Sequence, residues 1–327
     1  MTTQLRPLSL GQILDRTAEL YRMNFPLFAG ISAIFAGATL LTGLLRLGIE
    51  VLLGYPHVNP KLQWAVAAVT VISVLATLLV AGLAIAAITR AVARIYLGES
   101  TTIRSAVRSI GPRLGRYLWV MTIAGFRAWA PLAAVYIALF AVIFAYFPRG
   151  FLANPTVMQS SPPANLATML PLALAFLVLS PLFLLTLAYG VIMSLRYSLA
   201  VPACVVEELP ARQAIKRSIH LSIGSRGRIF VLGLLVYAVR MVLGTLLSLP
   251  FIFYAFKHLG HAIPIVMLAV QQLAAFVVST LIGPIYSTGL TLFYYDQRVR
   301  KEGFDIEWMM RSAGLTTHAG QPAAERS

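Results

Sequence analysis

Residues 169–195 read MLPLALAFLVLSPLFLLTLAYGVIMSL, without a single charged side chain. A helix that crosses a bilayer needs about 20 consecutive apolar residues, so this stretch predicts a membrane span. The whole chain agrees: of its 327 residues, 59% are hydrophobic and 11% are charged, against about 45–50% and about 25% in average soluble domains. We therefore predict an all-α, polytopic membrane protein, and the composition excludes a disordered, collagenous or disulfide-stapled chain.

Five further apolar stretches bring the predicted number of membrane spans to six. In chain order, the spans cover residues 25–45, 64–89, 117–147, 169–195, 229–256 and 263–295. The sixth is longer than a bilayer requires and contains Gly283–Pro284. We expect this span to tilt, to kink or to extend beyond the bilayer.

The basic residues gather on one side of these six spans. Of the 26 Lys and Arg, 20 fall in the two terminal segments and in the second and fourth connections, and only four fall in the other connections. Cytoplasmic loops carry an excess of Lys and Arg, so this division predicts that both termini are cytoplasmic. Topology and anionic lipid headgroups then account for the net charge of +15, and no nucleic-acid partner is indicated.

The two ends of the chain are polar. The first 24 residues lack an apolar stretch followed by a small-residue cleavage site, so we expect no removable signal peptide. Residues 311–327 are mostly small and polar, and they are expected to form a disordered cytoplasmic tail.

Each odd-numbered span is preceded by a short segment with one apolar and one polar helical face. These segments start near Leu10, Ile103 and Ala211, and the first opens with Ser9 and Gln12, a potential capping box. We predict one membrane domain, residues 1–310, built from pseudo-repeats of interfacial helix, span and span at residues 6–97, 98–204 and 205–310. The alternative is convergent composition, because any loop beside a membrane tends to be basic.

The three short segments share a basic residue followed by a hydroxyl: Arg16–Thr17, Arg108–Ser109 and Arg217–Ser218. Helices in the headgroup plane place basic residues near anionic lipid. The candidate lipid-headgroup contacts are therefore Arg16, Arg108, Arg217, Arg226 and Arg228. The last two flank a Gly224–Gly227 segment that fits either a weak phosphate-binding loop or, more simply, a flexible turn.

Three motifs resemble a known family. They are RPLSLGQILDR at residues 6–16, AVP at 200–202 with Glu207 and AIKRS at 214–218, and YYDQRVRKEGFD at 294–305. Together they resemble the bacterial six-span proteins labelled the glycerophosphoryl diester phosphodiesterase membrane domain. The resemblance covers most of the chain and implies a multi-pass protein of the bacterial inner membrane, with no settled activity.

No enzyme is predicted. A phosphodiesterase barrel needs about 250 residues, whereas the longest connection between spans covers only residues 196–228. The predicted spans hold no catalytic carboxylate, His or Cys, and no Gly-rich nucleotide loop occurs. We expect no cofactor. Ion pairing and helix capping are expected to explain the cytoplasmic acidic residues better than catalysis; these are Glu207, Glu208, Asp296, Glu302, Asp305 and Glu307.

Two further features carry weak chemical signals. His258 and His261 have the spacing of some metal pairs but lack a third ligand nearby, so no metal site is predicted. Cys204 is the only cysteine, which excludes an intramolecular disulfide. It is expected to be an ordinary interfacial residue, with palmitoylation as the functional alternative.

Arg127 and Arg240 are the most informative charges because they lie inside predicted spans. Each is about ten residues into its span, which places it near the bilayer midplane. An unpaired charge there costs about 3 kcal/mol or more, so each should face the bundle interior or a wet cavity. Gln271 and Gln272 lie at a similar depth. The four residues form either a structural polar network or a candidate binding site for an anion or lipid headgroup.

The leading functional hypothesis is a non-enzymatic inner-membrane protein. It would bind lipid or another anionic amphiphile and assist its movement, or assist the assembly of a membrane complex. The alternative is a scaffold that anchors a partner protein, or a second copy of this chain, through its basic cytoplasmic loops.

Overall fold

The computed structural model describes residues 7–54, 63–96, 98–146, 166–258 and 263–312. This part of the chain is helical and contains no strand. Six of its helices are long and apolar enough to cross a membrane, which confirms the predicted class and the predicted number of spans. They are α2 (Phe25–Leu52), α3 (Gln63–Tyr96), α5 (Leu114–Tyr146), α7 (Leu166–Tyr197), α10 (Arg226–Lys257) and α11 (Ile265–Glu302).

Several of these helices continue beyond the predicted spans. Helix α2 runs on to Leu52, so Arg46 belongs to the helix and forms an ion pair with Glu50 at 2.8 Å. Helix α11 runs on to Glu302 and includes Asp296. The predicted spans hold no Asp or Glu, whereas helices α2 and α11 extend past them and include Glu50 and Asp296. A helix can continue past the apolar layer, because water and headgroups solvate charges there.

Short helices occupy the connections. They are α1 (Leu10–Met23), α4 (Ile103–Arg108), η2 (Gly111–Arg113), α8 (Ala200–Val206), α9 (Ala211–Ser222) and α12 (Phe304–Ser312). The three helices expected before the odd-numbered spans are present as α1, α4 and α9, and the Ser9–Gln12 capping box is formed. Their position in a headgroup plane and the threefold repeat stay predictions. Helix α12 continues two residues into the predicted tail, of which residues 313–327 lie outside the described part.

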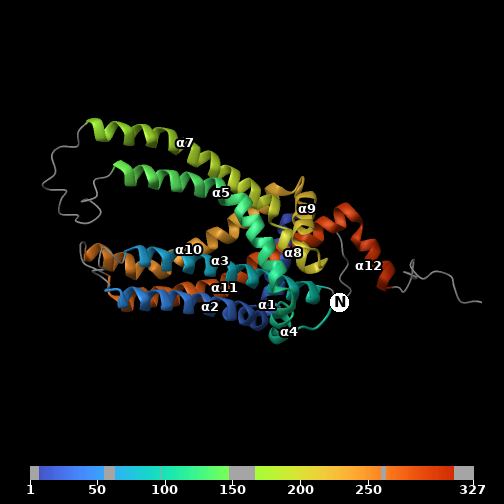
Figure 1. Ribbon diagram of the computed structural model, residues 1–327. Coiled ribbons are helices and arrows are strands. Elements are labelled where there is room, and N and C mark those ends of the chain that lie inside the picture. Colours follow the sequence, from blue (N-terminus) through green and yellow to red (C-terminus); the bar gives the residue numbers. More distant parts are fainter. Residues whose placement is uncertain (1–6, 55–62, 97, 147–165, 259–262, 313–327) are drawn as a thin grey trace, which may run out of the picture.

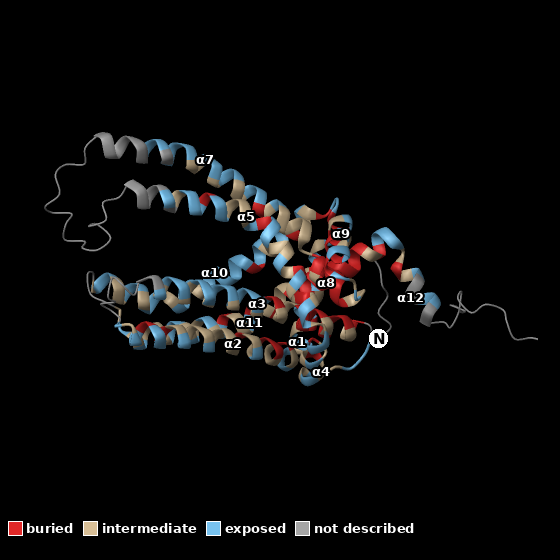
Figure 2. Ribbon diagram, in the orientation of Figure 1, coloured by how far each residue is buried: buried red, intermediate tan, exposed pale blue. Residues whose placement is uncertain are grey.

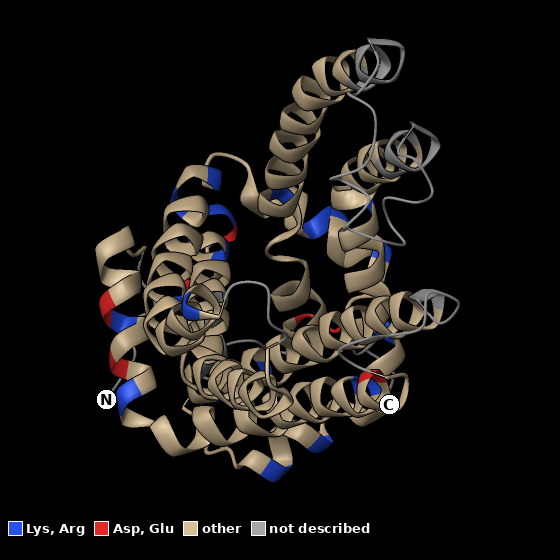
Figure 3. Ribbon diagram, turned by 90° about the vertical axis from the view of Figure 1, so that its left-hand side faces the viewer, with Lys and Arg blue, Asp and Glu red and all other residues tan. Residues whose placement is uncertain are grey.

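The long helices form two groups (Figure 1). Helices α2, α3, α10 and α11 lie together, with α11 packed against α2, α3 and α10. Helices α5 and α7 pack against each other as a hairpin that diverges from the other four, as the view along the helices also shows (Figure 3). The short helices gather at one end of the molecule, beside the N-terminus (Figure 1).

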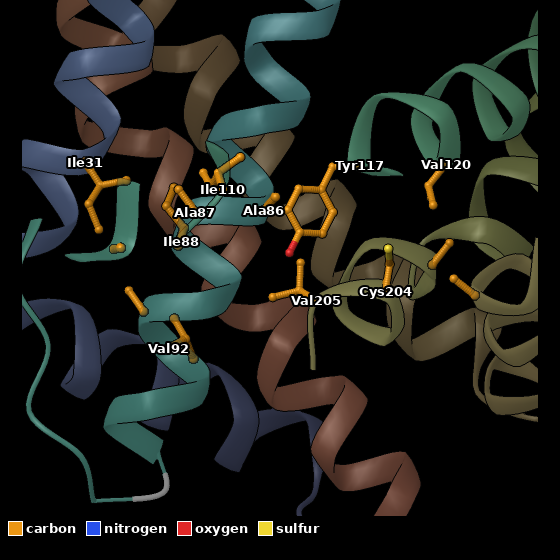
Figure 4. Close-up of a cluster of buried hydrophobic side chains, with 14 of the residues drawn as sticks. Ile31, Ala86, Ala87, Ile88, Val92, Ile110, Tyr117, Val120, Cys204 and Val205 are labelled. Carbon is orange, nitrogen blue, oxygen red and sulfur yellow. The ribbon is translucent and has the colours of Figure 1, made fainter. Parts of the chain in front are cut away.

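Burial is concentrated at the end that carries the short helices (Figure 2). One core cluster there joins Ile31 of α2, Ile88 of α3, Tyr117 of α5 and Val205 of α8 (Figure 4). Along the shafts, by contrast, at most 22% of the most apolar window of any long helix is buried inside the protein. Such extensive apolar exposure would be a liability in water, whereas in a bilayer lipid chains cover it.

Helix α11 is anchored where a proline interrupts it. Pro284 has no N–H, so it cannot donate to the carbonyl of Thr280 one turn earlier. The neighbouring carbonyls accept hydrogen bonds from other helices: Tyr21 Oη of α1 donates to the Leu281 oxygen at 2.8 Å, and Ser32 Oγ of α2 donates to the Ser279 oxygen at 3.0 Å. The interruption thus becomes a point of attachment for α1 and α2.

Candidate functional site

Two adjoining cavities lie among α2, α3, α10 and α11, with volumes of about 410 Å³ and about 290 Å³. The residues that line both are Thr39, Thr77, Arg240 and Ser279, one from each helix. The two cavities therefore share a polar wall that contains one cation. We call them the inner cavity (the larger, which reaches Ser287) and the outer cavity (the smaller, which reaches Arg46).

Arg240 is the distinctive residue of this shared wall. Neither cavity is lined by an Asp or Glu among the described residues. Within the same part of the chain, the guanidinium of Arg240 enters no ion pair or hydrogen bond. A guanidinium at membrane depth without an anion is costly, and the cavities give an anion access to it. Arg240 lines both cavities and is itself an exposed residue, and its role as a ligand-binding residue stays a prediction.

The outer cavity is the more polar of the two. Arg46, Gln272 and Ser73 line it together with the shared residues. Arg46 already pairs with Glu50, so its charge is compensated and Arg240 contributes the uncompensated one. Gln272 is thus the second predicted site residue that the structure places beside Arg240.

The inner cavity combines apolar walls with hydroxyl groups. Phe35, Ile85 and Ile282 are among its apolar lining residues, and Tyr237 and Ser287 are among its hydroxyls. A cavity of this kind suits the boundary between an apolar chain and a polar headgroup, because apolar walls accept the chain and a few placed polar groups orient the head.

Gly43 makes room for Gln272 in the outer cavity. A Cβ atom at position 43 would lie 2.9–3.0 Å from the side-chain amide of Gln272, closer than real Cβ contacts allow. Sequence reasoning missed this face of α2, although Thr39, Gly43 and Arg46 follow one another at helical spacing.

We expect Gly43→Ala to be less stable than Gly48→Ala by at most about 1 kcal/mol, because the group that a Cβ displaces is the end of the flexible Gln272 side chain. Both substitutions gain helix propensity on α2, but only the first displaces a neighbour, since nothing lies within 4 Å of a Cβ at Gly48. Thermal melting of the two variants in detergent micelles measures the difference. A loss of stability well above about 1 kcal/mol would contradict the expectation that the end of the Gln272 side chain moves aside.

Two of the predicted site residues lie elsewhere. Arg127 is exposed on α5 and lines neither cavity, and Gln271 is exposed on α11 and lines neither. Arg127 and Arg240 therefore share neither of these two cavities, and the expectation that Arg127 faces the bundle interior or a wet cavity stays a prediction. The physical reason is that depth along a helix does not determine which way a side chain faces, and α5 stands apart from the four helices that enclose the cavities (Figure 3).

The candidate lipid-headgroup arginines are mostly paired within the protein. Arg16 pairs with Glu19 at 2.6 Å, Arg217 with Glu207 at 3.0 Å, and Arg228 with Asp296 at 3.4 Å. Among the described residues, Arg108 and Arg226 form no ion pair, and the Nε atom of Arg226 is buried without a partner. Their contact with lipid stays a prediction.

The hydroxyl residue of the shared Arg–hydroxyl motif makes different hydrogen bonds in the three segments. Ser218 Oγ donates to the Arg196 carbonyl at 2.8 Å and accepts from the Leu199 amide at 3.2 Å, so it caps the end of α7. Thr17 and Ser109 donate only to carbonyls of their own helices, those of Ile13 and Ala106. The motif alone therefore does not establish equivalent contacts in the three pseudo-repeats.

The first and last of the three quoted motifs meet around one buried carboxylate. Asp296, whose side chain is 0% exposed, accepts from the Leu8 amide at 2.7 Å and pairs with Arg228 and Arg300. Both arginines also donate to the Leu8 carbonyl, at 2.8 and 2.6 Å. We call Leu8, Arg228, Asp296 and Arg300 the N-terminal clamp, because they fasten the start of the chain to α11.

The central motif joins the same end of the molecule through Glu207. This carboxylate accepts a hydrogen bond from Tyr294 and pairs with Arg217 and Arg298, and Arg217 and Arg298 also pair with Glu302. The prediction that the acidic residues at this end form ion pairs is confirmed for Glu207, Glu208, Asp296 and Glu302. Asp305 enters no ion pair among the described residues, and the side chain of Glu307 lies outside them.

The structure gives little support for a metal site at the histidines, for palmitoylation of Cys204 or for a phosphate-binding loop at Gly224. Among the described residues, no group of three or more His, Cys, Asp or Glu could hold a metal ion, and His261 lies outside them. Cys204 is 1% exposed in the core of Figure 4, with Sγ 3.3 Å from the Leu209 oxygen, and this burial argues against palmitoylation. Gly224 has φ +77° and forms the turn between α9 and α10, as the simpler expectation has it.

Comparison with family models, with curated proteins and with solved structures finds no match for this chain. The resemblance to the six-span membrane-domain family therefore stays an expectation from the motifs. What the structure supports is a multi-pass, all-α membrane protein with a cation-bearing cavity among α2, α3, α10 and α11.

Proposed function

We propose that the protein is a non-enzymatic membrane protein that binds an anionic amphiphile, with the anionic group beside Arg240, and assists its movement. The observation that carries the proposal is an uncompensated guanidinium on the wall between two cavities in the middle of a helix bundle. A bound carboxylate, phosphate or sulfate would supply the missing counter-charge through hydrogen bonds of the strong, charge-assisted kind.

The two cavities favour an amphiphile over a small inorganic anion. Gln272, Ser73 and Thr39 of the outer cavity offer hydrogen bonds to a polar head. Phe35, Ile85 and other apolar residues of the inner cavity offer contact to a hydrocarbon chain.

We propose the bacterial inner membrane as the location, with both termini cytoplasmic. The positive-inside rule and the motif resemblance support this orientation, in which the end that carries the short helices faces the cytoplasm. The scaffold alternative has less support, because Arg16, Arg217 and Arg228 are already paired inside the protein. Exposed Arg108 keeps this alternative testable by crosslinking after charge reversal.

Arg240→Gln is expected to reduce retention of anionic lipid by about tenfold or more, since one charge-assisted hydrogen bond contributes about 1.5–3 kcal/mol. The matched control is Arg127→Gln, which removes an arginine at similar predicted depth that lines neither cavity. Native mass spectrometry of both variants, reconstituted with equal amounts of anionic and zwitterionic phospholipid, measures the retained lipid. If Arg240→Gln retains as much anionic lipid as Arg127→Gln, the proposal fails.

A further inference from the structure

The turn between α8 and α9 lies between two groups of arginines. Its first residue, Glu207, pairs with Arg217 and Arg298, as described above. Its second, Glu208, faces the opposite group: Arg90 from α3, Arg113 from η2 and Arg116 from α5. We call Arg90, Arg113, Arg116 and Glu208 the Glu208 cluster.

Charge in the Glu208 cluster is unbalanced. Arg113 donates to Oε1 of Glu208, and Nη1 of Arg90 lies 3.5 Å from the same oxygen. Arg116 donates to the backbone carbonyl of Glu208 at 2.5 Å. The other polar group that the cluster contacts is the Tyr117 hydroxyl, 3.4 Å from Arg90, and it is neutral. Two guanidinium groups thus share the Glu208 carboxylate, and the third meets the backbone carbonyl of the same residue.

Arg90 has hydrogen-bonding capacity left over. Its side chain is 17% exposed, and its Nε atom is buried and has no partner among the described residues. A buried donor without an acceptor costs about 1–3 kcal/mol. An anion with more oxygens than the single carboxylate could satisfy this donor, and arginine matches phosphate oxygens in planar, two-point geometry.

The Glu208 side chain is an anion that can move out of the Glu208 cluster. Its backbone has φ +55°, and among the described residues it is the one non-glycine residue with positive φ. This left-handed conformation costs a non-glycine residue about 1 kcal/mol or more. The side chain is 46% exposed, so it can turn into solvent without crossing protein. The hydrogen bond from Arg113 holds the pKa of the Glu208 carboxyl below its ordinary value, so the group is an anion at neutral pH.

We propose that the Glu208 cluster is a binding site for a phosphate group, in which Glu208 occupies the place of the ligand until phosphate displaces it. A phosphate dianion compensates three arginines better than one carboxylate does. Because α3 and α5 reach the end with the short helices here, the group can belong either to a phospholipid head or to free phosphate (Figure 1). The proposal is independent of ligand binding at Arg240.

The test compares Glu208→Gln with Glu19→Gln, which removes an acidic side chain from an exposed pair at the same end. Each protein is placed in nanodiscs of phosphatidylcholine and titrated calorimetrically with inorganic phosphate. In a second arm, nanodiscs that contain phosphatidate are analysed for retained lipid. In at least one arm we expect Glu208→Gln to bind about tenfold more tightly than Glu19→Gln, because a competing charged hydrogen bond is removed.

Arg113→Gln should weaken the same binding about tenfold or more, whereas Arg104→Gln, at an exposed arginine of α4, should leave it unchanged. If Glu208→Gln does not fold, Glu208→Gly removes the carboxylate and adopts the positive φ without strain. The arm that responds identifies free phosphate or the lipid head as the ligand. Unchanged binding in both arms, for the Glu208 and Arg113 variants alike, overturns the proposal.

Discussion

Asp296→Ala is expected to lower the free energy of unfolding by about 3–5 kcal/mol, more than any other substitution considered for this protein. The substitution removes the carboxylate of the N-terminal clamp, whose side chain is 0% exposed. Arg228 and Arg300 would then face each other without an anion, and the Leu8 amide would lose its acceptor. Removing one partner from a buried, hydrogen-bonded ion pair is far more costly than removing one from a surface pair.

The control for this prediction is Glu19→Ala. It deletes the partner of Arg16 in an exposed pair on α1 and should cost at most about 1 kcal/mol. Denaturant titration of both variants in the same detergent gives the two free energies. Asp296→Asn, which keeps one oxygen to accept the Leu8 amide, should fall between them. If Asp296→Ala were no less stable than Glu19→Ala, the clamp would make no net contribution to stability.

Gly190→Leu is expected to destabilise the α5–α7 hairpin by about 1–3 kcal/mol. A Cβ at Gly190 of α7 would lie 3.0 Å from the Trp129 ring of α5 and 3.2 Å from the Ala128 carbonyl oxygen. Neither obstacle moves easily, because one is a bulky ring and the other is helix backbone. The two helices would have to separate, and close packing at small residues is a main source of helix association in membranes.

Gly125→Leu is the matched control, since nothing lies within 4 Å of a Cβ at this position of α5. With Trp64, Trp119 and Trp308 replaced by Phe in both variants, fluorescence reports on Trp129, whose ring lies against Gly190 and should shift its emission when the hairpin opens. An unchanged spectrum together with an unchanged melting temperature for Gly190→Leu would contradict the close approach of α5 and α7.

The six long helices could be predicted from the sequence because a bilayer permits few alternatives for a long apolar run. The short helices were predictable only where their faces alternate. Helix α1 has a clear polar face, whereas α8 reads AVPACVV, is apolar on every side and is largely buried, so it gives no periodic signal. The helical end points were missed where α2 and α11 continue into charged residues such as Glu50 and Asp296.

The candidate site was predictable in part. Arg240 stood out because a charge at membrane depth needs a compensating environment. The same argument could not say that Arg127 lines neither of the two cavities, because depth contains no information about direction. Thr39 and Thr77 were missed for a different reason: single hydroxyls in membrane helices usually bond to their own backbone, as Thr39 does with the Ala36 carbonyl. These hydroxyls line a common wall only because the four helices pack side by side.

The N-terminal clamp also constrains the order in which the chain can be completed. Leu8 and Asp296 are 288 residues apart, so the amide of the one cannot meet the carboxylate of the other until the chain through Asp296 has left the ribosome. Through the insertion of the first five spans, the start of the chain has no Asp296 to bind. In a truncated product that ends before α11, Leu8 therefore has no Asp296 to bind. The N-terminal segment of such a product is accessible, and this accessibility distinguishes it from a molecule that contains α11.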